Sequence, residues 1–274
     1  MKENILYPSK ANHRVIEISS TNSSNESKAH ISRWYAEMMI KEFLNDQFVD
    51  ENYIKKSLSE LIDILSKTVD PKIIHSLRLI KDFGDKASHY NPENIITDEQ
   101  ANKIVDEAMN LYILIILDEL KKRNLYYHTD RATLISVLLP NMRVKIYSEL
   151  IEFSSKEINL ELLWKWCLAC LKDNKISKAR RKMQELAKNG LITKSTCLEF
   201  DLNLEKIKSA IDNDELPIPN NRADFVRNLS NLLNEHNISS ESKLINARLI
   251  NILQSMADQI EPSSMGHYKG MRNF

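Results

Sequence analysis

SKAHISRWYAEMMIKEFL, residues 27–44, is the segment that decides the fold class. Its apolar side chains recur at spacings of three and four residues, as Ile31, Trp34, Tyr35, Met38 and Met39. This spacing places them along one face of a helix, because an α-helix completes a turn in about 3.6 residues. The segment therefore predicts an amphipathic helix that ends near Asn45.

The same spacing continues downstream and predicts three more helices, over about residues 54–65, 71–89 and 97–117. Pro71 suits the first turn of a helix, and Pro92 ends that helix because proline lacks an amide donor. Thr97 and Gln100 have the spacing of a capping box. Four helices with short connections predict an antiparallel four-helix bundle over residues 26–125.

The parts outside the bundle differ in composition. Residues 1–25 read as an arm, with a β-like run at Val15–Ile18 followed by the polar linker SSTNSSNES. Shorter helical patterns over residues 126–260 predict a second, smaller helical domain, and residues 261–274 read as a flexible tail. We therefore expect an all-α chain with two domains.

Composition limits the function classes. The 274 residues are 42% hydrophobic and carry no net formal charge, so no global field steers the chain toward nucleic acid. The longest apolar run, Leu111–Leu117, is far shorter than the roughly 20 residues that cross a bilayer. Three cysteines form no disulfide framework and fit a reducing interior. We expect a cytoplasmic protein with no membrane partner.

The segment KDFGDKASHYNP combines a glycine with titratable side chains on the third helix. Lys81, Asp85 and His89 are four residues apart and share one face, with Gly84 on the adjoining stripe. A histidine can act as a general base and a nearby cation can stabilise a phosphoryl charge, the two functions that RNA cleavage needs. The alternative is structural: Gly84 permits close helix packing and His89 caps the helix.

These two segments resemble the HEPN superfamily of helical bundles, in its uncharacterised prokaryotic branch associated with restriction and phage-defence proteins. The first helix of that branch has a basic residue four before an acid, here Arg33 and Glu37. LRLIKDFGDKASHY is similar to its Arg-x-x-Gly-Asn-x-x-x-His signature, with Lys81 in place of the arginine and Asp85 in place of the asparagine. The resemblance covers residues 26–124.

The resemblance implies a function and a set of site residues. It implies His89 as base, Lys81 or Arg78 as phosphate contact, and Asp85 with Glu37 as polar support. It also implies a homodimer, a setting in phage defence, and a partner from the same defence system. Because the signature departs at two positions, we expect a non-catalytic nucleic-acid-binding protein without cofactor or metal. A metal-independent ribonuclease centred on His89, or a protein-interaction adaptor, are the alternatives.

A basic segment marks the second domain. Residues 172–194 carry a net charge of about +6, an electrostatic footprint typical of nucleic-acid binding. The layout resembles a winged helix, with LITK and CLEFD pairing as a wing around Ser195-Thr196. A solvated basic face on a helical hairpin is the alternative. The predicted nucleic-acid contacts are Lys175, Lys178, Arg180, Arg181, Lys182 and Lys188.

Cys167 and Cys170 have a spacing that also occurs in metal and redox sites. Zinc takes four ligands, and the sequence supplies only Cys197 as a further thiol, without a histidine at suitable spacing. We therefore predict that these thiols pack in the core.

Overall fold

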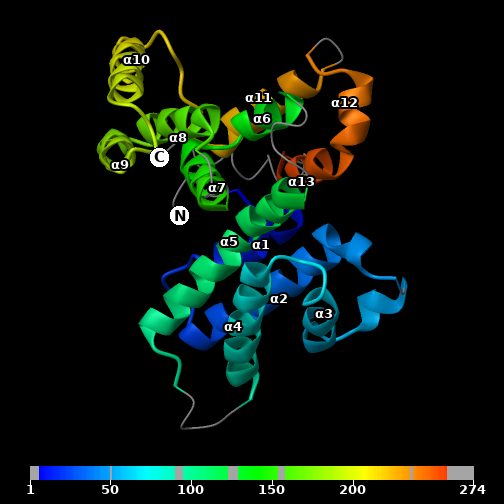
Figure 1. Ribbon diagram of the computed structural model, residues 1–274. Helices are drawn as coiled ribbons and strands as arrows, with labels where there is room; N and C mark the ends of the chain where they lie inside the picture. The colour runs from blue at the N-terminus through cyan, green and yellow to red at the C-terminus, as the bar shows by residue number, and fades with distance from the viewer. Residues whose placement is uncertain are drawn as a thin grey trace, which may run out of the picture. The chain divides into compact units, whose positions relative to one another are not determined.

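The computed structural model describes residues 6–49, 51–89, 95–122, 129–153, 158–234 and 237–257, and regular structure in these ranges is helical throughout (Figure 1). The predicted all-α class is therefore confirmed. The described residues up to Lys122, with those from Asn246 onward, form one compact unit, unit 1. Those from Thr129 to Ile245 form unit 2.

Unit 1 contains the following elements: η1 (Ser9–Ala11), α1 (Asn12–Ile18), α2 (Asn25–Phe43), η2 (Asn45–Gln47), η3 (Glu51–Lys55), α3 (Leu58–Leu65), α4 (Pro71–Ser88), α5 (Asp98–Lys122) and α13 (Ala247–Ala257). Helices α2, α4 and α5 pack against one another, α1 packs on α2, and α3 packs on α4. The core lies between these helices, and every residue from Leu111 to Leu120 of α5 is buried.

The predicted helix boundaries in unit 1 follow local chemistry. Pro71 occupies the first turn of α4, after the N-cap Asp70. The Thr97–Gln100 capping box is present, since the Thr97 amide donates to Gln100 Oε1 and the Gln100 amide donates to Thr97 Oγ1. Ser57 and Glu60 form a second box, so α3 begins at Leu58 and not near residue 54 as predicted; Ile54 lies in η3. These signals depend on residues three apart, which is why the sequence shows them.

The predicted β-like run at Val15–Ile18 is wrong. These residues form the end of α1, where Val15 and Ile18 are buried against unit 1. Ala11, Val15 and Ile18 are three and four residues apart, so a helix turns all three toward the same neighbour. Burial against α2 therefore decides the conformation over the β propensity of the short run.

Unit 2 contains the remaining elements: α6 (Thr129–Ser136), α7 (Pro140–Phe153), α8 (Leu160–Lys172), α9 (Ile176–Lys188), α10 (Lys194–Asp212), α11 (Arg222–Leu233) and α12 (Ser240–Ile245). Helices α7 and α8 pack together, and α8, α9 and α10 pack pairwise. The predicted second domain spanned residues 126–260, whereas unit 2 ends at Ile245 and α13 packs on α5 and η1 within unit 1.

The predicted wing over residues 191–201 is also wrong, because Lys194 begins helix α10. The Thr193 side chain accepts a hydrogen bond from the Thr196 amide at 3.0 Å, which caps this helix. Gly190 does end α9 as predicted. Its φ of +70° lies in the left-handed region, and the Leu191 amide donates back to the Leu186 carbonyl.

Candidate functional site

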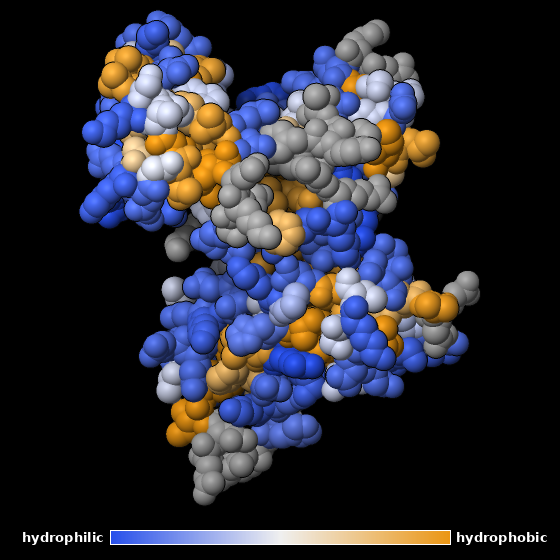
Figure 2. Space-filling view, in the orientation of Figure 1, coloured by the Kyte–Doolittle hydropathy of each residue, from blue (hydrophilic) through white to orange (hydrophobic). Residues whose placement is uncertain are grey.

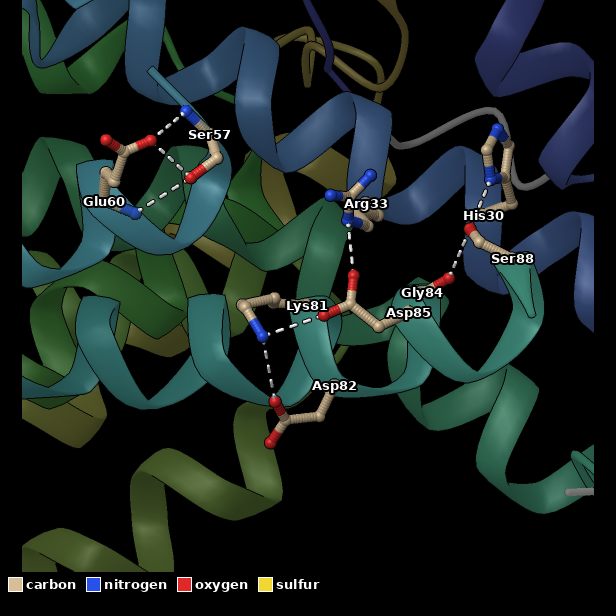
Figure 3. Close-up of polar contacts among 9 residues, drawn as sticks. All are labelled: His30, Arg33, Ser57, Glu60, Lys81, Asp82, Gly84, Asp85 and Ser88. Atoms are coloured by element: carbon tan, nitrogen blue, oxygen red, sulfur yellow. Dashed lines mark hydrogen bonds and ion pairs between the residues drawn. The ribbon is translucent and has the colours of Figure 1, made fainter.

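Gly84 of α4 lies directly beneath the side chain of Arg33 on α2 (Figure 3). A Cβ atom built on Gly84 falls 2.5 Å from Arg33 Cβ and 2.6 Å from Arg33 Cδ. No residue with a side chain fits there unless the backbone of α2 or α4 shifts, because Arg33 Cβ is fixed to its helix. The glycine in the KDFGDKASHYNP segment therefore lets Arg33 cross α4, which is the close helix packing that the structural alternative expected.

Asp85 lies one residue beyond Gly84, and its carboxylate pairs with two cationic side chains. Arg33 Nε is 3.0 Å from Asp85 Oδ1, and Lys81 Nζ donates to Oδ2 at 2.8 Å (Figure 3). Asp82 approaches Lys81 Nζ at 3.7 Å from the solvent side. The hydrogen bond to Asp85 is the main cause that raises the pKa of Lys81, so this amine stays protonated. The positive charges of Arg33 and Lys81 are therefore paired with carboxylates of the same cluster.

A second polar contact joins the same two helices at the end of α4. Ser88 Oγ donates to the Gly84 carbonyl at 2.8 Å and lies 3.2 Å from His30 Nδ1 (Figure 3). His30 is three residues before Arg33, and Ser88 is three after Asp85, so the two contacts run antiparallel. His30 was not among the predicted site residues. If the helices of residues 27–44 and 71–89 are paired antiparallel, the spacing along each helix predicts the contact between His30 and Ser88.

The other predicted site residues lie outside this cluster. His89 is exposed, with extended backbone (φ −120°, ψ 120°) just after the last residue of α4. It lies eight positions after Lys81, which corresponds to about 12 Å along the helix axis. Arg78 is exposed, and Glu37 bonds Lys41 at 2.6 Å. The structure joins Lys81 and Asp85 with Arg33, but it does not bring His89, Arg78 or Glu37 to them.

In unit 2, half of the predicted nucleic-acid contacts on and beside α9 have acidic partners. Arg180 pairs with Asp201 at 2.6 Å and with Glu205, both on α10. The remaining pairs are Lys175 with Asp173 at 2.6 Å and Lys182 with Glu185 at 3.3 Å. Asp173 and Glu185 are already counted in the net charge of about +6, whereas Asp201 and Glu205, more than 20 residues from Arg180, lower the local positive charge further.

Lys178, Arg181 and Lys188 are different, because all three are exposed and none pairs with an acid in the described part of the chain. Their spacings of three and seven residues place them along one face of α9. Lys178 Nζ also lies 5.9 Å from the centre of the Trp166 ring, within cation–π range. We call these three residues the α9 stripe. It is one part of the basic segment that remains open to an anionic partner; Lys194, at the start of α10, is also exposed and has no acidic partner among the described residues.

A groove of about 460 Å³ lies between α9 and α10. Met183 and Leu198 contribute apolar surface, Lys188 and Lys194 contribute positive charge, and Asp201 contributes negative charge. Figure 2 shows apolar atoms gathered among polar ones over the region of α8 to α10. Leu198 and Leu202, one turn apart on α10, are 62% and 57% exposed, so the apolar surface continues beyond the groove along α10.

Cys167 and Cys170 are fully buried in α8, as predicted for thiols that pack in the core. Burial raises the pKa of each thiol to about 12, so both stay protonated and unreactive at neutral pH. In the described ranges, no three His, Cys, Asp or Glu side chains are grouped so as to hold a metal ion. Nor does any described helix have the length and apolar character to cross a bilayer.

The chain matches no model of a known protein family, no curated protein and no solved structure.

Proposed function

We propose that this chain is a non-catalytic nucleic-acid-binding protein and that the α9 stripe is its phosphate-contacting surface. The observation that carries the proposal is the set of three exposed side chains, Lys178, Arg181 and Lys188, on one helix face without acidic partners in the described residues. Cations in such a row suit the regular negative charge of a phosphate backbone.

The strength and specificity of binding follow from the small number of cations. Three phosphate contacts give sequence-independent binding, with a Kd on the order of 10⁻⁴ to 10⁻⁶ M at physiological salt. On duplex DNA they give a salt slope of about −3, since each neutralised phosphate releases close to one counterion. The binding is therefore expected to weaken steeply as salt rises.

Unit 1 has a supporting role in this proposal. The cations of its polar cluster are held by Asp85, and His89 lies about 12 Å from Lys81 along α4, which supports a non-catalytic bundle. A HEPN-like identity, a homodimer through this bundle and a setting in phage defence with a defence-system partner are parts of the proposal that rest on the sequence resemblance alone.

A triple variant tests the proposal. Lys178→Gln/Arg181→Gln/Lys188→Gln should lower affinity for a 20-nucleotide duplex at least tenfold at 50 mM salt and flatten the salt slope by about 3. The control is Lys55→Gln/Lys67→Gln/Lys103→Gln, which removes the same charge from exposed sites in unit 1. Equal weakening by both variants, or no binding by the unchanged protein at low salt, would refute the proposal.

The groove between α9 and α10 supports a second candidate, a protein-interaction adaptor. Its apolar lining at Met183 and Leu198, with Lys188 and Lys194 at the rim, suits an amphipathic helix that carries acidic residues. Leu198→Asn places an uncharged polar group in this lining, so it should weaken binding of such a helix strongly. Nucleic-acid affinity should change less than twofold, because the charge near Lys188 is unchanged, and this separates the two candidates.

A further inference from the structure

One hydrogen bond fixes the register of α7 and α8 in unit 2. Trp166 Nε1 on α8 donates to Ser148 Oγ on α7 at 2.8 Å. The two consecutive helices pack together as an antiparallel hairpin. Arg143 lies five residues before Ser148, and Leu171 lies five after Trp166. The register therefore brings Arg143 level with the last turn of α8, which also carries Lys172.

Arg143 is buried as a charged group without a counter-ion. Only 8% of the residue is exposed, and its Nε and Nη2 atoms are buried without a hydrogen-bond partner. In the described part of the chain no acidic side chain pairs with it. An unpaired guanidinium in the interior loses hydration that nothing replaces, so folded proteins rarely retain one. An anion that binds beside this guanidinium would therefore stabilise the folded protein.

Lys172 adds a second positive charge at the same place. Its side chain is partly buried and has no acidic partner among the described residues. Burial first, and the charge of Arg143 second, lower the pKa of Lys172, so the two cations are close enough to repel. The neighbouring carboxylate, Asp173, is bonded to Lys175 at 2.6 Å. Tyr147 is the other polar group that interacts with Arg143, and it is neutral at physiological pH.

We propose that Arg143 and Lys172 form a binding site for a phosphate-class oxyanion. The two unpartnered nitrogens, Nε and Nη2, lie on one edge of the guanidinium and are covered by protein atoms, so two oxygens of a single oxyanion can bridge that edge once the side chains over it move aside. The Lys172 ammonium, on a flexible stem, donates to a third oxygen from the solvent side. The site lies on α7 and α8, so it stands apart from the α9 stripe and does not depend on it.

The experiment measures thermal unfolding of the full chain in inorganic phosphate against chloride at equal ionic strength, with direct titration by calorimetry. Phosphate should raise the unfolding midpoint saturably by at least about 2 °C. Arg143→Met should abolish this shift while leaving the protein equally or more stable in chloride, because it removes an uncompensated charge. Lys172→Met, at a partly exposed position, should weaken phosphate binding at least tenfold. This variant provides the test if Arg143→Met does not fold.

Two further arms identify the source of the phosphate group. Competition between inorganic phosphate and a short single-stranded oligonucleotide would assign the site to a nucleic-acid backbone. Phosphate binding that the oligonucleotide does not displace would assign it to a free oxyanion or a small phosphorylated ligand. The α9 triple variant should keep the phosphate shift, which separates this site from the proposed function. No shift with phosphate or oligonucleotide, or an unchanged shift in Arg143→Met, would overturn the inference.

Discussion

Arg33 of α2 crosses α4 over Gly84, so that a Cβ atom on Gly84 falls 2.5 Å from Arg33 Cβ. Beyond the glycine, Arg33 Nε reaches Asp85 at 3.0 Å. One absent side chain thus brings two helices together and lets their charged residues pair. The unusual residue in KDFGDKASHYNP is explained by packing, and the adjoining charges are explained by the crossing that it allows.

Gly84→Ala should destabilise unit 1 by about 1 to 3 kcal/mol, the usual cost of overpacking, although alanine is the better helix former. Urea unfolding followed by circular dichroism measures the change. In an Arg33→Gly background the nearest contacts are gone, so the same substitution should instead stabilise by up to about 1 kcal/mol. A destabilisation of equal size in both backgrounds would show that Arg33 is not the obstacle.

Asp70→Asn should make the protein less dependent on pH in acid. Burial alone would raise the pKa of Asp70, but hydrogen bonds from Lys121 Nζ (2.6 Å) and from the Lys72 amide (2.8 Å) outweigh it and lower the pKa from its ordinary 3.8. A lowered folded-state pKa stabilises the fold above pH 3.8, and this stabilisation is lost as the pH falls through the folded value.

The variant should therefore be less stable than the unchanged protein by about 1 to 2 kcal/mol at pH 7, with a difference that shrinks below pH 3.8. Asparagine keeps an oxygen for the helix cap, so the charge is what is tested. Asp63→Asn, at an exposed position of α3, is the control and should change little at any pH. A constant difference from pH 7 to pH 3 would contradict the assignment.

Arg248→Ala should destabilise the packing of α13 on the rest of unit 1, as measured by urea unfolding. Arg248 Nη1 lies 3.0 Å from Asp46 Oδ2 and 3.5 Å from Glu119 Oε2, and Glu119 is only 2% exposed. Removing a cation from beside a buried carboxylate should cost about 2 to 4 kcal/mol. Arg227→Ala breaks an exposed pair with Asp224 and should cost no more than about 1 kcal/mol, so comparable losses would refute this role.

His89→Ala should leave stability within about 0.5 kcal/mol, because the side chain is exposed at the end of α4. A non-catalytic bundle further predicts no RNA cleavage in the presence of a chelator, with or without the substitution. The measurement is cleavage of a labelled single-stranded RNA by both proteins. Chelator-resistant cleavage that disappears only in the variant would establish the ribonuclease alternative and end the non-catalytic proposal.

Most of the helices could be predicted because their signals are local. The spacing of apolar residues, Pro71 at a first turn and the Thr97–Gln100 box act within one or two turns of helix, and α2, α4 and α5 begin and end close to where these signals place them. The prediction of a wing is wrong because Thr193 caps a helix, and a threonine is among the residues that favour this cap position. The prediction of a β-like run at Val15–Ile18 is wrong because four residues are too few to show a helical or strand period.

The candidate site was less predictable, because some of its residues are near neighbours in sequence while others come from a different helix. Lys81 and Asp85 were expected on one face and do bond each other, four residues apart. Arg33 joins them from another helix, and the acids that neutralise Arg180 lie on α10, more than 20 residues away. Such partners depend on which helices pack together, and the basic segment therefore looked more open to nucleic acid than it is.

By itself, the sequence determined that this chain is helical and where most helices begin and end, because hydrogen bonds and apolar periodicity within a helix join near neighbours. Only the tertiary structure decided that α13 packs on α5 and η1, that Gly84 lies under Arg33, and that Arg143 is buried without a counter-ion among the described residues. Each of these depends on contacts between segments far apart in the chain, where burial and charge pairing are set by packing.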